Sequence, residues 1–342
     1  MPALQMQSML DRYGALTLEG IRRYVPDKEP RKYLYDLVLD YPERGGKHFR
    51  PCLCIATGKA FGGTVDLLLN SAVTLELLHN AFLIHDDVED ESFMRRNKPA
   101  MHEYSSRSIA INVGDAMNAL AISPLLENKG LLGPKLTLAI FREIHHMVLE
   151  SAEGQAMELG WRKDNLQTLT DNDYFRMILK KTCWYTCMHP IRIGALIATH
   201  GKINPDTLNR LGYFMGVAFQ VQDDILNLVA EENKYGKEIG GDILEGKRTL
   251  MLIHLMQHCT ETERKELIDF LGQPIRQRNP ELVPLFLKRM QHYGSIDHAK
   301  EISKYMAGAA LKEFYTTFSR LPDSEHKAFI ESIILYMINR DY

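Results

Sequence analysis

The chain has 342 residues, of which 45% are hydrophobic, so it can bury a large core. Its 41 basic and 44 acidic residues give a formal net charge of −3, which excludes the strong basic excess typical of nucleic-acid or membrane-surface binding. Five cysteines without paired CxxC spacing, no leader-like N-terminus and no apolar run near the ~20 residues of a membrane span indicate a cytoplasmic protein with free thiols and no stable membrane insertion.

The hydrophobic pattern is helical almost throughout. Thr64 to Lys98 contains no glycine or proline and is largely apolar on all sides, which predicts a helix buried within a bundle. In chain order, helix-compatible segments are residues 3–22, 31–41, 47–60, 64–98, 104–126, 133–161, 170–199, 203–233, 242–258, 261–271, 280–293, 296–320 and 324–339. No run of alternating strands and no linker is found, so we predict a single all-α domain spanning 1–342, with a central bundle of long helices.

Two acidic clusters lie far apart, each inside an apolar stretch. They are Asp86-Asp87-Val88-Glu89-Asp90 and Asp223-Asp224-Ile225-Leu226-Asn227. Carboxylates avoid cores unless positive charge meets them. Residues i and i+4 share one helix face, about 6 Å apart along the axis. Two such helices facing each other would form a carboxylate-walled cavity for several Mg²⁺ ions, which prefer oxygen ligands completed by substrate phosphates.

Basic residues accompany these clusters, often beside glycine. They are Lys47 and Arg50 after Gly45-Gly46, Arg95-Arg96, Lys180-Lys181-Thr182, Lys237 and Lys247-Arg248. Arginine forks and lysine point charges both suit phosphate oxygens. Any one of them is usually a solvated surface charge. Together with two acidic clusters they indicate a substrate set with two polyphosphate groups.

In combination, these motifs resemble the trans-isoprenyl diphosphate synthases of the polyprenyl synthetase family. The resemblance runs from about Gly45 to Thr249 and rests on an ordered set: Gly45 to Pro51, His79, Asp86 to Asp90, Arg95-Arg96, Gly154-Gln155, Lys181-Thr182, Phe219 to Asp224 and Gly236-Lys237. It implies the isoprenoid synthase fold, in which long antiparallel helices surround a central cavity, and a homodimer. It also implies Mg²⁺-dependent condensation of isopentenyl diphosphate with an allylic diphosphate.

The resemblance assigns roles residue by residue. Asp86, Asp90 and Asp223 would hold Mg²⁺, three ions in all, with Asp87 and Asp224 supporting them. The allylic diphosphate would be gripped by Arg95, Lys181, Gln220, Lys237 and Lys247, with Thr182 beside Lys181. Isopentenyl diphosphate would be held by Gly46, Lys47, Arg50, His79 and Arg96. Ionisation of the allylic C–O bond would then be assisted by metal and cations, and no protein nucleophile is required.

Product length is expected to depend on the helix that carries the first cluster. Phe82 lies one turn before Asp86 on the same face, where the family places bulky groups that block the growing tail. An alternative is that Phe82 is only a core residue. The neighbouring Ala81 is small and leaves room. We expect a short product, geranylgeranyl diphosphate first and farnesyl diphosphate second.

Three residues depart from the family pattern: Asn227 replaces the last aspartate of the second cluster, Asn97 stands where glycine is common, and Met251 where proline is common. An amide oxygen at Asn227 brings no charge but can still ligate or hydrogen-bond a metal-bound water. Three alternatives are considered. A class I terpene cyclase needs only one diphosphate site, and a non-catalytic subunit of a heteromeric prenyl synthase should lose its acidic clusters. The third alternative is a P-loop NTPase. The last is rejected because Arg248 replaces the Ser/Thr of G-x-x-x-x-G-K-[ST] and no strand precedes it.

Overall fold

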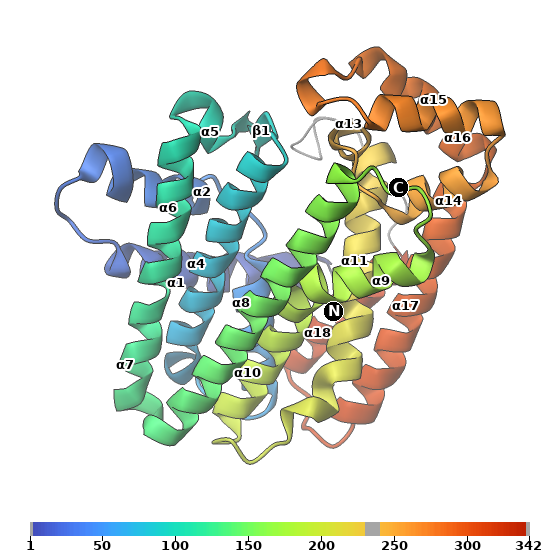
Figure 1. Cartoon of the computed structure of the whole chain (residues 1–342). Coiled ribbons are helices and arrows are strands. Elements are labelled where there is room, and N and C mark those ends of the chain that lie inside the picture. Colours follow the sequence, from blue (N-terminus) through green and yellow to red (C-terminus); the bar gives the residue numbers. More distant parts are fainter. Residues whose placement is uncertain (1–2, 230–239, 340–342) are drawn as a thin grey trace.

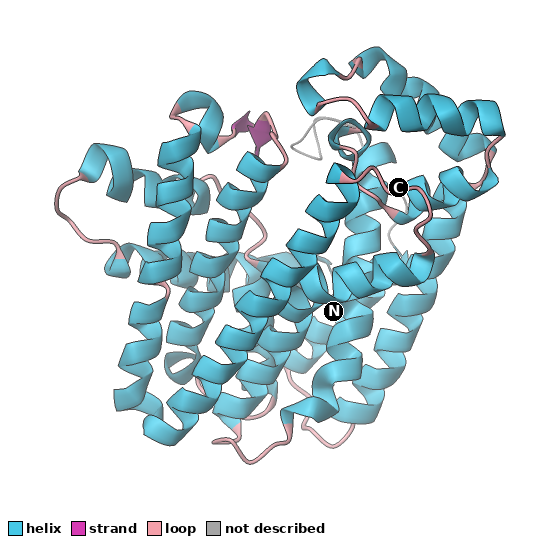
Figure 2. Cartoon of the chain, viewed as in Figure 1, coloured by secondary structure: helices cyan, strands magenta, loops and turns pink. Residues whose placement is uncertain are grey.

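The computed structural model describes residues 3–229 and 240–339, and these form an almost wholly helical bundle (Figures 1 and 2). The α-helices are α1 (Ala3–Tyr24), α2 (Asp36–Glu43), α3 (Phe49–Ala60), α4 (Val65–Glu89), α5 (Met101–Tyr104), α6 (Arg107–Leu120), α7 (Ile122–Leu132), α8 (Pro134–Lys163), α9 (Asp171–Ile178), α10 (His189–Ala198), α11 (Asn209–Val229), α13 (Gly241–Glu245), α14 (Leu250–His258), α15 (Glu261–Leu271), α16 (Val283–His292), α17 (Ser295–Phe318) and α18 (Glu325–Asn339). The π-helical stretches are η1 (Arg31–Tyr35) and η2 (Leu179–Met188), the 3₁₀ turns are η3 (Pro205–Leu208), η4 (Ile275–Gln277) and η5 (Pro280–Leu282), and the strands are β1 (Met94–Arg95) and β2 (Lys98–Pro99). The predicted all-α fold is confirmed.

The predicted helix from Thr64 to Lys98 ends early, at Glu89, and a short hairpin follows it. β1 and β2 pair antiparallel around the two-residue turn Arg96-Asn97. Both turn residues have positive φ, 52° and 60°, which is the geometry of a type I′ turn. Asparagine tolerates this left-handed backbone better than most residues. Asn97 therefore fits a position where glycine is common. The turn was not predicted because the stretch from Thr64 to Lys98 contains no glycine or proline.

The predicted helix over 170–199 is interrupted by the π-helical stretch η2. The segment passes from α9 through η2 into α10 without leaving helical geometry. A π-helix has a wider turn and is found often at functional sites. Here it carries Lys181, Thr182 and Tyr185, which line the cavity described below. The predicted helix over 104–126 is likewise divided, at Ala121, into α6 and α7.

Two clusters of buried apolar side chains form the core. The larger unites α1, α3, α4, α6 to α8, α10 and α18, and the smaller unites α9, η2 and α14 to α16. α11, α17 and η2 contribute to both clusters, which joins the two parts of the bundle. All five cysteines are buried and free, in agreement with the predicted free thiols. Figure 1 shows the hairpin, α13 and α15 at the same end of the bundle.

Within residues 3–229 and 240–339, two helical stretches are long and apolar enough to cross a membrane by length and composition alone, contrary to the expectation from the sequence. They are Val65–Glu89 and Arg107–Leu132. The most apolar window of the first is 72% buried, as expected of a core helix. That of the second is only 39% buried, so α6 and α7 present apolar side chains outward.

Candidate active site

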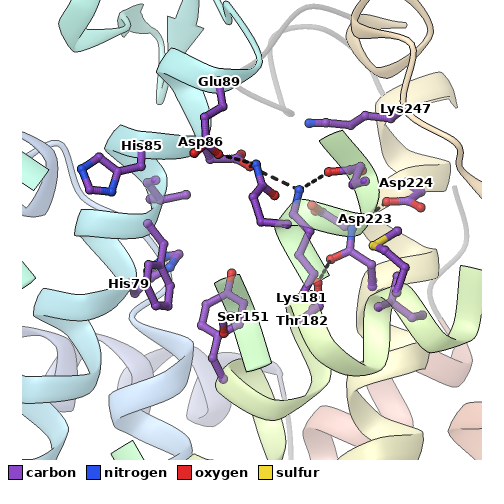
Figure 3. A pocket seen from close by; sticks show the side chains of 18 of the residues that line it. His79, His85, Asp86, Glu89, Ser151, Lys181, Thr182, Asp223, Asp224 and Lys247 are labelled. Carbon is purple, nitrogen blue, oxygen red and sulfur yellow. Dashed lines mark hydrogen bonds and ion pairs between the residues drawn. The ribbon is translucent and has the colours of Figure 1, made fainter. Parts of the chain in front are cut away.

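A cavity of about 560 Å³ opens between α4, α8, η2 and α11 at the end of the bundle that carries the hairpin and α13. Twelve of the predicted site residues line it: Arg50, His79, Phe82, Asp86, Arg95, Arg96, Lys181, Thr182, Gln220, Asp223, Asp224 and Lys247. Figure 3 shows Asp86 and Glu89 on one side and Asp223 and Asp224 on the other, with Lys181 extending between them. The expectation that the two acidic clusters face each other agrees with this arrangement.

The first cluster divides its carboxylates between the cavity and the protein behind it. Asp86 lines the cavity, where Lys181 Nζ and Gln155 Nε2 each approach its Oδ1 at 3.3 Å. Asp87 is fully buried and accepts hydrogen bonds from Tyr41 Oη at 2.6 Å and Arg95 Nε at 3.0 Å. Because Asp87 is turned about 100° from Asp86 around the helix, it supports Arg95 from behind instead of facing the cavity.

Asp90 does not line the cavity, although its spacing from Asp86 predicted a shared face. It follows the last residue of α4 and is fully buried. Its carboxylate is paired with Arg162 and, at 2.8 Å, with Lys247 Nζ. A buried carboxylate needs such partners. A metal ion at Asp90 would therefore have to take the place of a cation.

The second cluster also presents one exposed and one buried carboxylate. Asp223 is exposed to the cavity. Asp224 is 7% exposed and accepts hydrogen bonds from Tyr174 Oη and Gln220 Nε2, both at 2.7 Å. Burial and the nearby charge of Asp242 raise the pKa of Asp224 well above its usual range. A positive ion in this part of the cavity would counter that repulsion.

Asn227 has a structural role that its sequence position did not reveal. Its side chain is buried, and its Oδ1 accepts the backbone N–H of Asp242 at 3.1 Å. Its carbonyl oxygen accepts the N–H of Gly240 at 2.7 Å. Asn227 thus holds the start of α13 and places Asp242 in the cavity wall beside the second cluster.

Lysines on two elements complete the acidic side of the cavity. Lys181 is paired with Asp86 and Glu158, and Lys247 with Asp90 and, at 2.7 Å, Glu245. Burial acts to lower the pKa of both ammonium groups, but these carboxylates outweigh burial and raise it. Both lysines therefore remain protonated, as a phosphate-binding role requires. Lys237, a further predicted ligand, lies outside the described residues.

A second set of cationic groups lies around Arg50 on α3 and His79 on α4, about two turns along α4 from Asp86. Arg50 donates to His79 Nε2 at 3.2 Å and to Thr186 Oγ1 at 2.8 Å, and its guanidinium lies over the Tyr185 ring at 4.2 Å. Burial, followed by the charges of Arg50 and Arg96, holds the pKa of His79 well below 6.5. His79 is therefore neutral, with its proton on Nδ1. Among the described residues that buried Nδ1 has no partner, so it can donate to a ligand.

The glycine-rich segment before α3 lies against Arg96. Arg96 Nη1 donates to the carbonyl of Tyr41 at 2.7 Å, and a Cβ on Gly46 would lie 2.8 Å from Arg96 Nη2. With φ at +145°, Gly46 also has a backbone that other residues rarely adopt. Lys47 is exposed beside it and, like Gly46, does not line the cavity.

Two further predicted residues support their neighbours within the cavity wall. Thr182 Oγ1 donates to Gln220 Oε1 at 2.9 Å. This bond orients the amide so that its Nε2 donates to Asp224. Thr182 and Gln220 therefore join η2 to α11 at the second cluster.

The apolar part of the cavity begins one turn below Asp86. Phe82 is half-buried, lines the cavity and meets the Tyr185 ring edge-to-face at 5.6 Å. Leu83, Val148, Met177 and Ile178 also line it. Ala81 is fully buried in the larger core cluster and does not line the cavity.

Several side chains of the site were given no role from the sequence, although Gln155 belongs to the motif Gly154-Gln155. Ser151, Gln155, Glu158 and Arg162 form a polar stripe along one face of α8, at spacings of four, three and four residues. The first three line the cavity, and Arg162 meets Asp90. This periodicity could have revealed the stripe. Tyr41 and Tyr174, which donate to Asp87 and Asp224, have no comparable local signal.

Comparison with known proteins places this chain in a family. Residues 31–284 match the family model described as polyprenyl synthetase. The chain belongs to the polyprenyl synthetase family. It is 35% identical to the geranylgeranyl diphosphate synthase of Saccharolobus solfataricus over 67% of this chain and 68% of the relative. It is 30% identical to that of Methanosarcina mazei over 94% of each chain.

Solved structures of the polyprenyl synthetase family share the fold. The crystal structure of the geranylgeranyl pyrophosphate synthetase from Pyrococcus horikoshii superposes with a TM-score of 0.84 at 30% identity, covering 98% of each chain. Other relatives, at 25% and 27% identity, are named geranylfarnesyl and octaprenyl diphosphate synthases. Family membership therefore leaves the product length open.

The donor set of the cavity suits magnesium better than a softer metal. Asp86, Glu89, Asp223 and Asp224 offer carboxylate oxygens, which Mg²⁺ prefers. Within residues 3–229 and 240–339, no three side chains of His, Cys, Asp or Glu are close enough to hold a metal ion by themselves. This fits an ion that one or two carboxylates bind together with substrate phosphates.

Proposed function

We propose that the chain catalyses the Mg²⁺-dependent head-to-tail (1′–4) condensation of isopentenyl diphosphate with an allylic diphosphate. The observation that carries this proposal is the presence of two separate cationic sets in one cavity. Lys181 and Lys247 accompany the acidic clusters, whereas Arg50 and Arg96 lie with His79. A terpene cyclase binds one diphosphate and would have no use for the second set, and a non-catalytic subunit would not need both acidic clusters.

The acidic side would bind the allylic diphosphate. Asp86 and Asp223 face the cavity and would hold Mg²⁺, with Asp90 joining after releasing Arg162 or Lys247. When bound, Mg²⁺ would supply positive charge that stabilises the departing pyrophosphate. Lys181 and Lys247, protonated at neutral pH, would bind the same phosphate oxygens. Arg95, fixed by Asp87, would add a third cation.

The set formed by Arg50, His79 and Arg96 would hold isopentenyl diphosphate with its double bond toward the allylic carbon. Arg50 and Arg96 would pair with its phosphates, and His79 Nδ1 would donate to them; Gly46 and Lys47 would close this site from the segment before α3. Holding the two reactants together removes much of the entropic cost of their encounter. The aromatic and aliphatic walls exclude water, which would quench the allylic cation. Proton loss to the released pyrophosphate would complete the reaction.

We propose a short product, geranylgeranyl diphosphate first and farnesyl diphosphate second. The Phe82–Tyr185 pair lies one turn below Asp86, where a growing chain would meet it. The relatives named above as geranylgeranyl diphosphate synthases favour the first product. Ala81 is in the core, so Phe82, beside Leu83, is the aromatic residue of that turn that would meet the chain.

We also propose a cytoplasmic homodimer of one-domain subunits spanning residues 1–342. The outward face of α6 to α8 carries Ile111, Ile122, Leu126, Leu131, Leu138 and Leu149, each at least 44% exposed. Clustered apolar exposure of this kind is typical of a protein interface. A second copy of the same face would cover it, as expected of a two-fold dimer. The contribution of α11 and α17 to both core clusters supports one domain.

Product mass spectrometry tests the proposal. The protein with Mg²⁺ and isopentenyl diphosphate is given dimethylallyl, geranyl or farnesyl diphosphate in turn. We expect each primer to be extended in five-carbon steps, ending at 20 carbons. Cyclic hydrocarbon formed from an allylic diphosphate alone would replace the proposal with a cyclase, and extension well beyond 20 carbons would overturn the proposed product.

A further inference from the structure

Two buried arginines, Arg248 and Arg278, hold the loop that carries Lys247. Arg248 is 1% exposed and Arg278 is 8% exposed. In the part of the chain that the structure describes, their hydrogen bonds go to backbone carbonyls and one amide oxygen, and none goes to a carboxylate. Buried guanidinium groups are normally paired with an acid. Two of them in the same region with only neutral acceptors require a functional explanation.

Arg248 ties the Lys247 loop to the segment that follows α8. Its Nη1 donates to the carbonyl of Gly246, on one side of Lys247. Its Nη2 donates to Asn165 Oδ1 at 2.7 Å and its Nε to the carbonyl of Leu166 at 3.4 Å. The planar guanidinium holds its donors in fixed, widely spaced directions, which the compact ammonium of a lysine does not reproduce. The backbone on both sides of Lys247 is therefore anchored to the segment that follows α8.

Arg278 holds the same loop from the other side. Its Nη1 donates to the carbonyl of Leu244, in the last turn of α13, and its Nη2 to that of Leu271 at 2.8 Å. Gly246 makes this approach possible, because a Cβ there would lie 2.7 Å from Arg278 Nη1. Gly246 also has φ at +76°, a conformation that favours glycine.

The two arginines add positive charge behind the cavity wall. Burial and the charge of neighbouring arginines lower the pKa of each guanidinium to about 10, so both remain charged at neutral pH. Arg248 itself lines the cavity. Lys247, by contrast, is matched by Asp90 and Glu245. An anionic ligand beside Lys247 would therefore be attracted by the positive charge of Arg248 and Arg278, which no carboxylate of the loop neutralises.

We propose that Arg248 and Arg278 are positioning residues for the allylic diphosphate, which fix Lys247 in place and supply the positive potential that draws this diphosphate to the α13 side of the cavity. The proposal rests on the proposed function for the name of the ligand. Its physical content is the selective binding of a magnesium-complexed diphosphate at this side.

The test is calorimetric titration of inorganic pyrophosphate with Mg²⁺ into wild type, Arg248→Gln and Arg278→Gln, together with KM values for both substrates. We expect each variant to bind pyrophosphate about tenfold more weakly or worse, the loss typical of removing a charged hydrogen-bond donor. The KM for the allylic substrate should rise in parallel, while the KM for isopentenyl diphosphate stays within about twofold. Arg248→Lys, which keeps the charge without the fork, should fall between wild type and Arg248→Gln.

Arg264→Gln is the matched control. Arg264 also donates to backbone carbonyls, those of Met256 at 2.8 Å and Cys259 at 3.4 Å, but it pairs with Glu261 as well and does not line the cavity. This variant should bind pyrophosphate as wild type does. Unchanged affinity in both folded Arg248 and Arg278 variants, an equal loss in the control, or an equal rise in both KM values would overturn the proposal. Failure of wild type to condense the substrates would sink the proposed function instead and leave the pyrophosphate comparison intact.

Discussion

Truncation of Phe82 to alanine should lengthen the product. Phe82 meets the Tyr185 ring edge-to-face at 5.6 Å, and both side chains line the cavity below Asp86. Removing the Phe82 ring takes away one of the two groups in the path of the chain. The space it leaves adjoins the apolar side chains of the cavity, so a further isoprenyl unit can occupy it.

The energies favour the longer chain. A further unit buries five carbons, which at about 0.8 kcal/mol for each buried CH₂ amounts to about 4 kcal/mol as an upper limit. Against this stands the lost aromatic pair, worth about 1 kcal/mol. Because Phe82 is only half-buried, its truncation should cost less stability than the 3–5 kcal/mol, roughly, of a fully buried phenylalanine. The variant should therefore fold and shift its main product by at least one five-carbon unit.

The assay is mass spectrometry of the products, with thermal unfolding measured in parallel. Phe141→Ala is the matched control, since Phe141 packs partly buried against the larger core cluster on α8 and does not line the cavity. The control should lose some stability and keep the wild-type product. An unchanged product from folded Phe82→Ala would refute the reasoning and return Phe82 to the core.

Two further predictions concern stability at low pH and the second acidic cluster. Although burial opposes it, hydrogen bonds from Arg192 and His189 lower the pKa of Glu143 from 4.5 to about 2, a shift worth about 3 kcal/mol. Because the pKa is lowered, this stability is present above about pH 4.5 and is lost as the pH falls toward 2. Urea unfolding at several pH values should show the free energy of unfolding falling over this range, and Glu143→Gln should make that fall smaller. An equally steep fall in Glu143→Gln would contradict the role given to Glu143. The variant Asn227→Ala should reduce turnover about tenfold, because it loses the acceptor for the N–H of Asp242. The variant Asn227→Asp keeps an acceptor oxygen and should stay active. Equal losses in these two variants would contradict the role given to Asn227.

The sequence predicted the site best where the signal was local. The family resemblance gave Asp87 only a supporting role, and in the structure Asp86 faces the cavity while Asp87 meets Tyr41. The prediction that Asp90 shares the cavity face of Asp86 was wrong. α4 ends just before Asp90, and its carboxylate is paired with Arg162, 72 residues away, behind the cavity wall. The hairpin after α4 was missed because Asn97 supplied the left-handed turn without glycine.

Contacts between distant segments could not be predicted at all. The hydrogen bonds from Tyr174 to Asp224 and from Arg248 to Asn165 each join segments at least 50 residues apart. Nothing in the spacing of either residue identifies its partner. Their positions follow from how α8, α9 and α11 pack, which depends on the whole core. Such residues are identified only in the structure, where buried polar groups are found hydrogen-bonded to one another.

The most direct test of the two-diphosphate cavity is pyrophosphate release measured in three mixtures, all with Mg²⁺. These contain isopentenyl diphosphate alone, an allylic diphosphate alone, or both. We predict sustained release only from the mixture that contains both, and loss of that release in Asp86→Ala with the helical fold retained. Comparable release from the allylic diphosphate alone would contradict the account, because the set formed by Arg50, His79 and Arg96 would then have no second substrate to bind.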